Sequence, residues 1–112
     1  MADAREFPFR GSVIWLTPEQ GGRTTGPPEP GTPWPYYAAT AYVPPHTADT
    51  GLTSFILRNF ETGAWRSHAE GRWLVDDPHG SQLVRPGSVI AVTEGVKVVA
   101  YFTIQHIQNL KG

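Results

Sequence analysis

The chain has 112 residues, which is enough for one domain with a modest core. Its formal net charge of −1 excludes an overall basic field that would attract nucleic acid. A local basic patch is compatible with this charge only if it is small. Cysteine is absent, which excludes disulfides and thiolate metal sites, and no apolar run reaches the length of a membrane span or a signal peptide. We therefore expect a single domain over residues 1–112, located in the cytoplasm and not bound to a membrane.

The composition favours an all-β fold with many loops. There are 12 glycines and 11 prolines, and runs of helix-forming residues are scarce. Four Trp, four Tyr and five Phe supply apolar surface for a core, which argues against a disordered chain. The polar residues 1–6 are expected to form a frayed end.

The first predicted strand covers residues 9–16, in which Phe9, Val13 and Trp15 recur with the period of two that is typical of a strand. A long loop rich in proline and glycine is predicted at 17–35, with six of the 11 prolines. A loop of this length in a small domain is usually functional or disordered, and proline limits disorder because it fixes φ. We therefore expect a functional loop.

Further strands are predicted at 36–43, 52–60 and 72–76, with a short extended segment at 64–67. Turn-forming residues separate these segments, including the Asp-Pro-His-Gly sequence at 77–80. About six short strands with turns between them are typical of a small β-barrel or β-sandwich.

The most regular segment is 88–107, which predicts two strands joined by a tight turn at Glu94-Gly95. Valine, isoleucine, threonine and aromatic residues fill both halves, and these residues suit a half-buried pleated surface. After the turn, the residues alternate between two faces of the strand. One face carries Val98, Ala100, Phe102 and Ile104, and the other carries Val99, Tyr101, Thr103, Gln105 and Ile107.

Three segments together resemble the C-terminal (third) β-barrel domain of bacterial elongation factor Tu. They are G-S-V-I-W-L-T-P-E-Q-G-G-R-T-T at 11–25, P-Y-Y-A-A-T-A-Y-V at 35–43 and A-V-T-E-G-V-K-V-V-A-Y-F-T-I at 91–104. They are similar to that family's E-x-G-G-R loop, its proline-led aromatic strand and its closing E-G hairpin. The intervening residues 44–85 depart from the family. The resemblance implies a closed six-stranded antiparallel β-barrel.

The same resemblance implies a binding surface. In that family the G-G-R loop and the final hairpin turn contact aminoacyl-tRNA, and these contacts correspond here to Arg23, Thr24, Glu94 and Gly95. The family has histidine where this chain has Thr24, whereas Lys97 keeps a basic residue after the turn. No G-x-x-x-x-G-K-[ST] loop occurs in the chain, so we expect no binding or hydrolysis of GTP.

Aromatic residues leave two kinds of partner open. Trp34, Tyr36 and Tyr37 adjoin the proline-rich loop, where exposed aromatic residues can anchor a protein partner or stack on RNA bases, and we assign Trp34 and Tyr36 to the binding site. We expect Trp15 and Trp73 in the core. Because the net charge is close to zero, we predict a protein partner at residues 21–35 and 94–95, with tRNA or another RNA at the same surface as the alternative.

An enzyme is the third hypothesis and the least supported by the sequence. Asp76, Asp77 and His79, with His68 and Glu70, are the residues that could form a metal or catalytic cluster. Their spacing matches no metal motif, and an Asp-Pro turn explains the first three. No G-x-S-x-G nucleophile sequence occurs. We expect a non-catalytic chain without a metal or cofactor.

Overall fold

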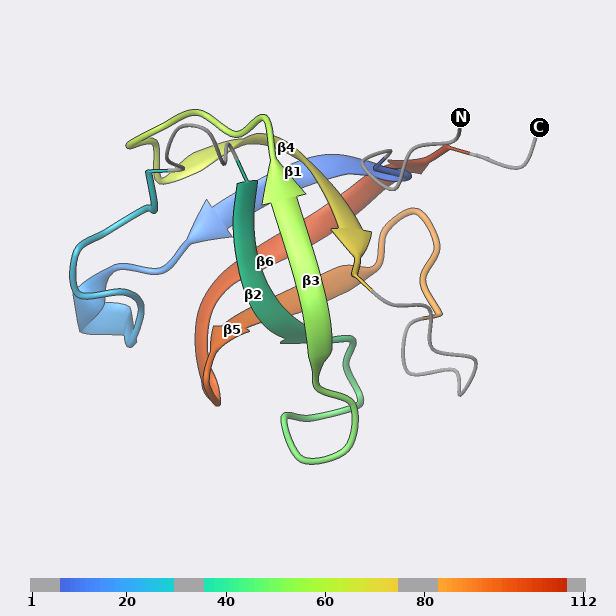
Figure 1. Ribbon diagram of the computed structural model, residues 1–112, viewed down its shortest axis with the longest axis horizontal. Helices are drawn as coiled ribbons and strands as arrows, with labels where there is room; N and C mark the ends of the chain where they lie inside the picture. Colours follow the sequence, from blue (N-terminus) through green and yellow to red (C-terminus); the bar gives the residue numbers. More distant parts are fainter. Residues whose placement is uncertain (1–6, 30–35, 75–82, 109–112) are drawn as a thin grey trace.

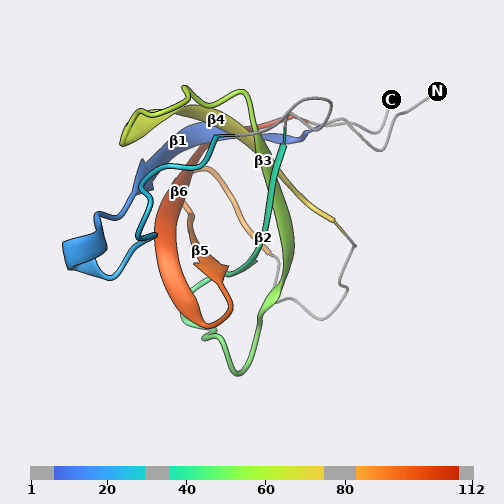
Figure 2. The ribbon, with the colours of Figure 1, turned by 60° about the vertical axis from the view of Figure 1, so that its left-hand side comes forward.

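The computed structural model describes residues 7–29, 36–74 and 83–108, and within them six antiparallel strands close into a barrel (Figures 1 and 2). The order around the barrel is β1-β4-β3-β2-β5-β6. The predicted all-β fold with a closed six-stranded antiparallel barrel is therefore confirmed. The strands are β1 (Phe9–Trp15), β2 (Tyr36–Tyr42), β3 (Thr53–Arg58), β4 (Arg66–Trp73), β5 (Val89–Glu94) and β6 (Lys97–Ile107).

Strand β1 closes the barrel because it pairs with β4 on one side and with β6 on the other. Its side chains alternate as predicted, so Val13 and Trp15 are buried while Arg10 is exposed. Gly11 lies at the junction with β6, where a Cβ would sit 1.9 Å from the backbone oxygen of Thr103. Only glycine permits this approach, so Gly11 determines how closely β1 and β6 pair.

Aromatic side chains from several strands fill the barrel. The ring of Phe55 lies 4.9 Å from Trp73 and 5.9 Å from Phe102, measured between centroids, and Phe55 and Phe102 are fully buried. Trp15 and Trp73 are 2% and 8% exposed, which confirms that both belong to the core, whereas Trp65 is 43% exposed. This core holds the strands together through buried apolar area and edge-to-face ring contacts.

Strand β4 is where the sequence prediction was wrong. The segments expected at 64–67 and 72–76 belong to a single strand, Arg66–Trp73, and residues 75 and 76 lie outside the described part. A Cβ at Gly71 would lie 2.6 Å from the ring of Phe55 and 3.2 Å from that of Phe102. The rings of Phe55 on β3 and Phe102 on β6 therefore fill the space in front of β4, and three of its four inward residues are small, Ser67, Ala69 and Gly71, whereas the fourth is Trp73.

The predicted hairpin of β5 and β6 is present, with its turn one residue later than expected. Glu94 pairs with Lys97, and the turn consists of Gly95, with a φ of +64°, and Val96. Glycine at the first central position suits a two-residue turn of type II′. A β-bulge at Val92/Thr93 shifts the register, and Val99 is fully buried instead of sharing the outer face with Tyr101.

Candidate functional site

The first part of the predicted loop is held in a defined shape. Thr17 caps a short 3₁₀-helix, η1 (Pro18–Gln20): its hydroxyl accepts from the backbone N–H of Gln20, and the Gln20 side chain accepts from the backbone N–H of Thr17. Gly21 ends the helix with a φ of +91°. This capping turns the chain back toward the barrel and places the next residues, Gly22 and Arg23, beside the β5–β6 hairpin.

Arg23 connects the loop to the hairpin. Its Nε lies 2.8 Å from Glu94 Oε2 without the alignment of a hydrogen bond, so charge attraction holds the pair. Nη1 of the same guanidinium donates a hydrogen bond of 2.8 Å to the backbone oxygen of Gly26. The guanidinium carbon also lies 5.9 Å from the ring centroid of Tyr37, within the range of a cation–π contact.

Tyr37 binds the same carboxylate from the barrel side. Its hydroxyl donates a 2.6 Å hydrogen bond to Glu94 Oε2, and its ring packs edge-on against Trp15 at 5.2 Å. Burial, followed by the hydrogen bond and the negative charge of Glu94, raises the pKa of Tyr37 well above its usual range, against a smaller lowering by Arg23. The hydroxyl therefore keeps its proton and remains a donor at neutral pH.

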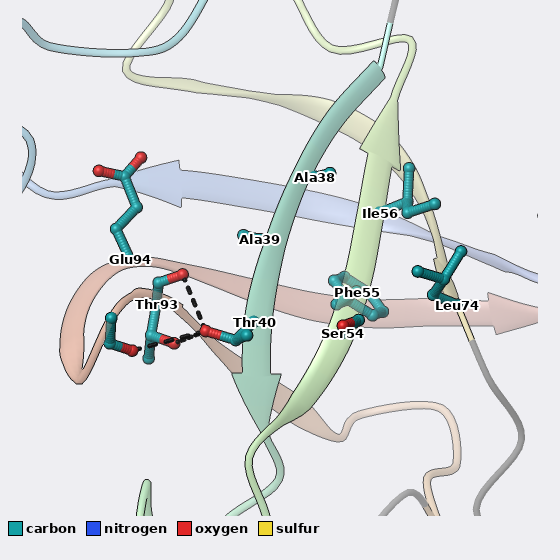
Figure 3. Close-up of a pocket in the computed structure, with 10 residues that line it drawn as sticks. Ala38, Ala39, Thr40, Ser54, Phe55, Ile56, Leu74, Thr93 and Glu94 are labelled. Carbon is teal, nitrogen blue, oxygen red and sulfur yellow. Dashed lines mark hydrogen bonds between the residues drawn. The ribbon is translucent and has the colours of Figure 1, made fainter.

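A lysine and two threonines complete the connection. Lys97 Nζ donates a 3.2 Å hydrogen bond to the backbone oxygen of Gly22, which fastens the loop to β6. The hydroxyls of Thr40 on β2 and Thr93 on β5 lie 2.6 Å apart and point toward one another (Figure 3). We call the contacts of Arg23, Tyr37, Glu94 and Lys97 the latch, and the outer surface of residues 17–29 and 94–97 the loop–hairpin surface.

A hollow of about 370 Å³ lies beside the hairpin, on the outer side of β2 and β3. Small side chains, Ala38, Thr40 and Ser54, form much of its lining (Figure 3). Ile56 and the half-exposed Leu74 border it on one side, and Thr93 and Glu94 border it on the other. Gly95 also lines it. We call this hollow the groove. It is continuous with the loop–hairpin surface because Glu94 and Gly95 belong to both.

The structure brings together four of the residues predicted from the sequence. Arg23, Glu94, Gly95 and Lys97 come from two segments about 70 positions apart and meet at the loop–hairpin surface. Thr24 is exposed on the same loop, next to Arg23. Trp34 lies outside the described residues.

Tyr36 does not join this group. It faces the outside of the barrel, where its ring stacks on Phe7 with a centroid distance of 5.7 Å. The guanidinium carbon of Arg58 lies 4.0 Å from the centroid of Phe7, and Arg58 Nε binds Glu70 Oε1 at 2.7 Å. The neighbour of Tyr36, Tyr37, was considered with it in the sequence but not assigned to the site, although it is the tyrosine that binds Glu94. The alternation of β2 is the signal that could have found it, since it directs Tyr37 inward with Ala39 and Ala41.

The cluster considered for metal binding is largely beyond the described residues, because Asp76, Asp77 and His79 are not among them. His68 is exposed on β4, and Glu70 accepts hydrogen bonds from Arg58 and from Asn59 Nδ2. Within the described ranges, no three His, Asp or Glu side chains lie close enough to hold a metal ion.

Comparison of the chain with protein-family models gives no match, and comparison with curated proteins gives none either. The resemblance to the third domain of elongation factor Tu therefore stays a prediction. The part of the chain that the structure describes has no helix long and apolar enough to cross a membrane.

Proposed function

We propose that this protein is a non-catalytic binding module, resembling the C-terminal barrel of elongation factor Tu, that engages a protein partner through the loop–hairpin surface and the groove. The latch is the observation that carries the proposal. It joins three segments: an ion pair at 2.8 Å and a hydrogen bond of 3.2 Å hold the loop to the hairpin, and a hydrogen bond of 2.6 Å holds the hairpin to β2. A surface that is ordered before binding loses less conformational entropy when the partner arrives.

The two cations at this surface are already bound within the chain, which favours a protein over RNA as the partner. Arg23 and Lys97 are the basic residues that the family resemblance would assign to phosphate contacts. Both are engaged within the chain, Arg23 by Glu94 and the Gly26 oxygen, and Lys97 by the Gly22 oxygen. A phosphate would have to compete with a carboxylate that already neutralises Arg23, which weakens the alternative of RNA at this surface.

The apolar groups around the groove suit an extended segment of a protein partner. Val96 is 76% exposed at the tip of the hairpin, and Leu74 is 50% exposed at the opposite border. Among the described strands, Ala38 and Ala39 pair with β3 only, because the pairing of β5 with β2 begins at Thr40. A peptide can add to such an edge through backbone hydrogen bonds while its side chains enter a neighbouring pocket.

Two substitutions that leave the net charge unchanged test the proposal. Ala38→Gln fills the groove from an exposed position, and Val96→Ser removes the exposed apolar group at the hairpin tip. The matched control is Leu83→Ser, since Leu83 is 79% exposed and does not line the groove. Tagged wild-type protein and the three variants are used to capture partners from lysate with and without ribonuclease, and the captured protein is identified, purified and titrated.

We expect the purified partner to bind wild-type protein and the Leu83→Ser variant equally, and the Ala38→Gln and Val96→Ser variants at least about tenfold more weakly, a loss typical of an interface anchor. Binding should survive ribonuclease. Equal binding by all four proteins, or a partner that is lost with ribonuclease and whose capture depends on Ala38 and Val96, would overturn the proposal. Circular dichroism of each variant shows whether the barrel is intact.

A further inference from the structure

A second surface lies across the barrel from the groove, on strands β4, β1 and β6, and carries three arginines: Arg10, Arg66 and Arg72. Strand β1 lies between β4 and β6, and the registers align their outward residues in three rows across the strands. In the order β4, β1, β6, the rows are Arg66, Ile14 and Tyr101; His68, Ser12 and Thr103; and Glu70, Arg10 and His106. Arg72 follows on β4, where its Nε donates to the backbone oxygen of Trp73. We call the outer surface of these residues the basic face.

The charges on the basic face are unbalanced. Glu70 is its carboxylate, and it is held by Arg58 at 2.7 Å, with Arg10 at 3.6 Å. Because Arg58 and Glu70 neutralise each other, the charges of Arg10, Arg66 and Arg72 remain in excess. Arg66 is exposed and forms no ion pair with a described residue, and the Arg10 side chain is 59% exposed. Along the chain, the next described carboxylate before β4 is Glu61, in the turn that leads into the strand.

Exposed aromatic and apolar groups lie among these charges. Tyr101 is 40% exposed, and Ile14, its cross-strand neighbour, is 39% exposed and pairs on its other side with Arg66. Trp65 immediately precedes Arg66 and is 43% exposed. Aromatic rings between cations are the combination that proteins use to bind single strands, since bases stack on the rings while arginines contact the phosphates.

We propose that the basic face binds single-stranded nucleic acid, with Arg66, Arg72 and Arg10 contacting phosphates and Tyr101 stacking on a base. Arg66 and Arg72 are six positions apart on one strand, about 20 Å, so the face is long enough to contact several nucleotides. The polar side chains between them also suit a hydrated backbone: Ser12, Gln105 and His68. Gln105 Nε2 donates to Ser12 Oγ at 3.0 Å. This proposal does not depend on the proposed function, which uses another surface.

The test is fluorescence anisotropy with a labelled single-stranded RNA of about 20 nucleotides, longer than the site of a typical small barrel. Three phosphate contacts predict that affinity falls about 20-fold when the salt concentration rises from about 50 to about 200 mM. Arg66→Gln should reduce both the affinity and the salt dependence, and Tyr101→Leu should weaken binding about tenfold. Arg85→Gln is the matched control, because it removes one charge from an exposed arginine outside the basic face.

Four results would overturn this inference. One is the absence of binding at low salt, and another is binding that does not change with salt. A third is an equal loss of RNA affinity in the Arg66→Gln and Arg85→Gln variants, which would mean that the affinity depends on net charge alone. A fourth is Arg66-dependent binding to phosphatidylserine vesicles without binding to RNA, which would identify a membrane surface instead. The Ala38→Gln variant should bind RNA like the wild type, so failure here and failure of the proposed function are distinguishable.

Discussion

Replacing Tyr37 with phenylalanine tests the latch at the bond that joins the barrel to the hairpin. The variant keeps the ring against Trp15 and removes only the hydroxyl that donates to Glu94 at 2.6 Å. A hydrogen bond to a charged group contributes about 1.5 to 3 kcal/mol to stability. Because the Glu94 side chain is 40% exposed, water can partly replace the lost donor. We therefore expect the free energy of unfolding at neutral pH to fall by about 1.5 kcal/mol.

The pH dependence of this difference is a sharper prediction. The pKa of Tyr37 is raised in the folded protein, so above the ordinary tyrosine value near 10 the unfolded chain loses a proton that the folded chain retains. Alkali therefore favours unfolding of the wild type, by about 1.4 kcal/mol per pH unit, and the Tyr37→Phe variant lacks this contribution. The stability difference between the two proteins should shrink from about 1.5 kcal/mol at pH 7 to nearly zero at about pH 11.

Urea unfolding followed by tryptophan fluorescence measures both quantities, since Trp15 lies directly against Tyr37. Arginine keeps its charge at pH 11, so Arg23 remains paired throughout the range. A stability difference that stays constant from pH 7 to pH 11 would refute the reasoning, because it would mean that Tyr37 ionises equally in the folded and unfolded states.

Two further predictions concern the barrel itself. Gly11→Ala should lower the free energy of unfolding by about 3 kcal/mol or more, because its Cβ would meet the backbone oxygen of Thr103. The control Gly63→Ala, at a φ of +80° with no atom within 4 Å, should lower it by only about 1 to 2 kcal/mol in urea unfolding. Equal losses would contradict the close packing of β1 on β6 at Gly11. Thr93→Val should cost about 1 kcal/mol, because it removes the 2.6 Å partner of the Thr40 hydroxyl and leaves it only the longer contacts of 3.4 and 3.5 Å with the backbone oxygens of residue 93 and Gly95. The double Thr40→Val/Thr93→Val variant should be more stable than additivity predicts. Additive losses would show that the two hydroxyls act independently.

The fold was predictable wherever large apolar residues alternate along the chain. Residues 88–107 are filled with valine, isoleucine, threonine and aromatic residues, and both strands and the short turn are present. Most of strand β4 was not predictable because its first three inward positions are small: Ser67, Ala69 and Gly71. Their size is set by Phe55 and Phe102 on other strands, and no local pattern reveals which rings will face a segment in the folded barrel.

The candidate site was predictable in its position and less so in its chemistry. Arg23 and Glu94 were assigned to one surface from the family resemblance, and they do meet. They were expected to contact a partner, whereas they bind each other, because the loop brings Arg23 within 2.8 Å of Glu94 on the hairpin. Both Tyr36 and Tyr37 were considered and only Tyr36 was assigned to the site, since adjacent tyrosines on a strand differ only in the face to which they point.

The central claim is that the loop–hairpin surface and the groove bind a protein partner. The most direct test is a calorimetric titration of the purified partner, identified by capture, against wild-type protein and the Ala38→Gln and Leu83→Ser variants. The account predicts unchanged affinity for Leu83→Ser and a loss of at least about tenfold for Ala38→Gln, with both variants folded. Equal affinity for the wild type and Ala38→Gln would contradict it.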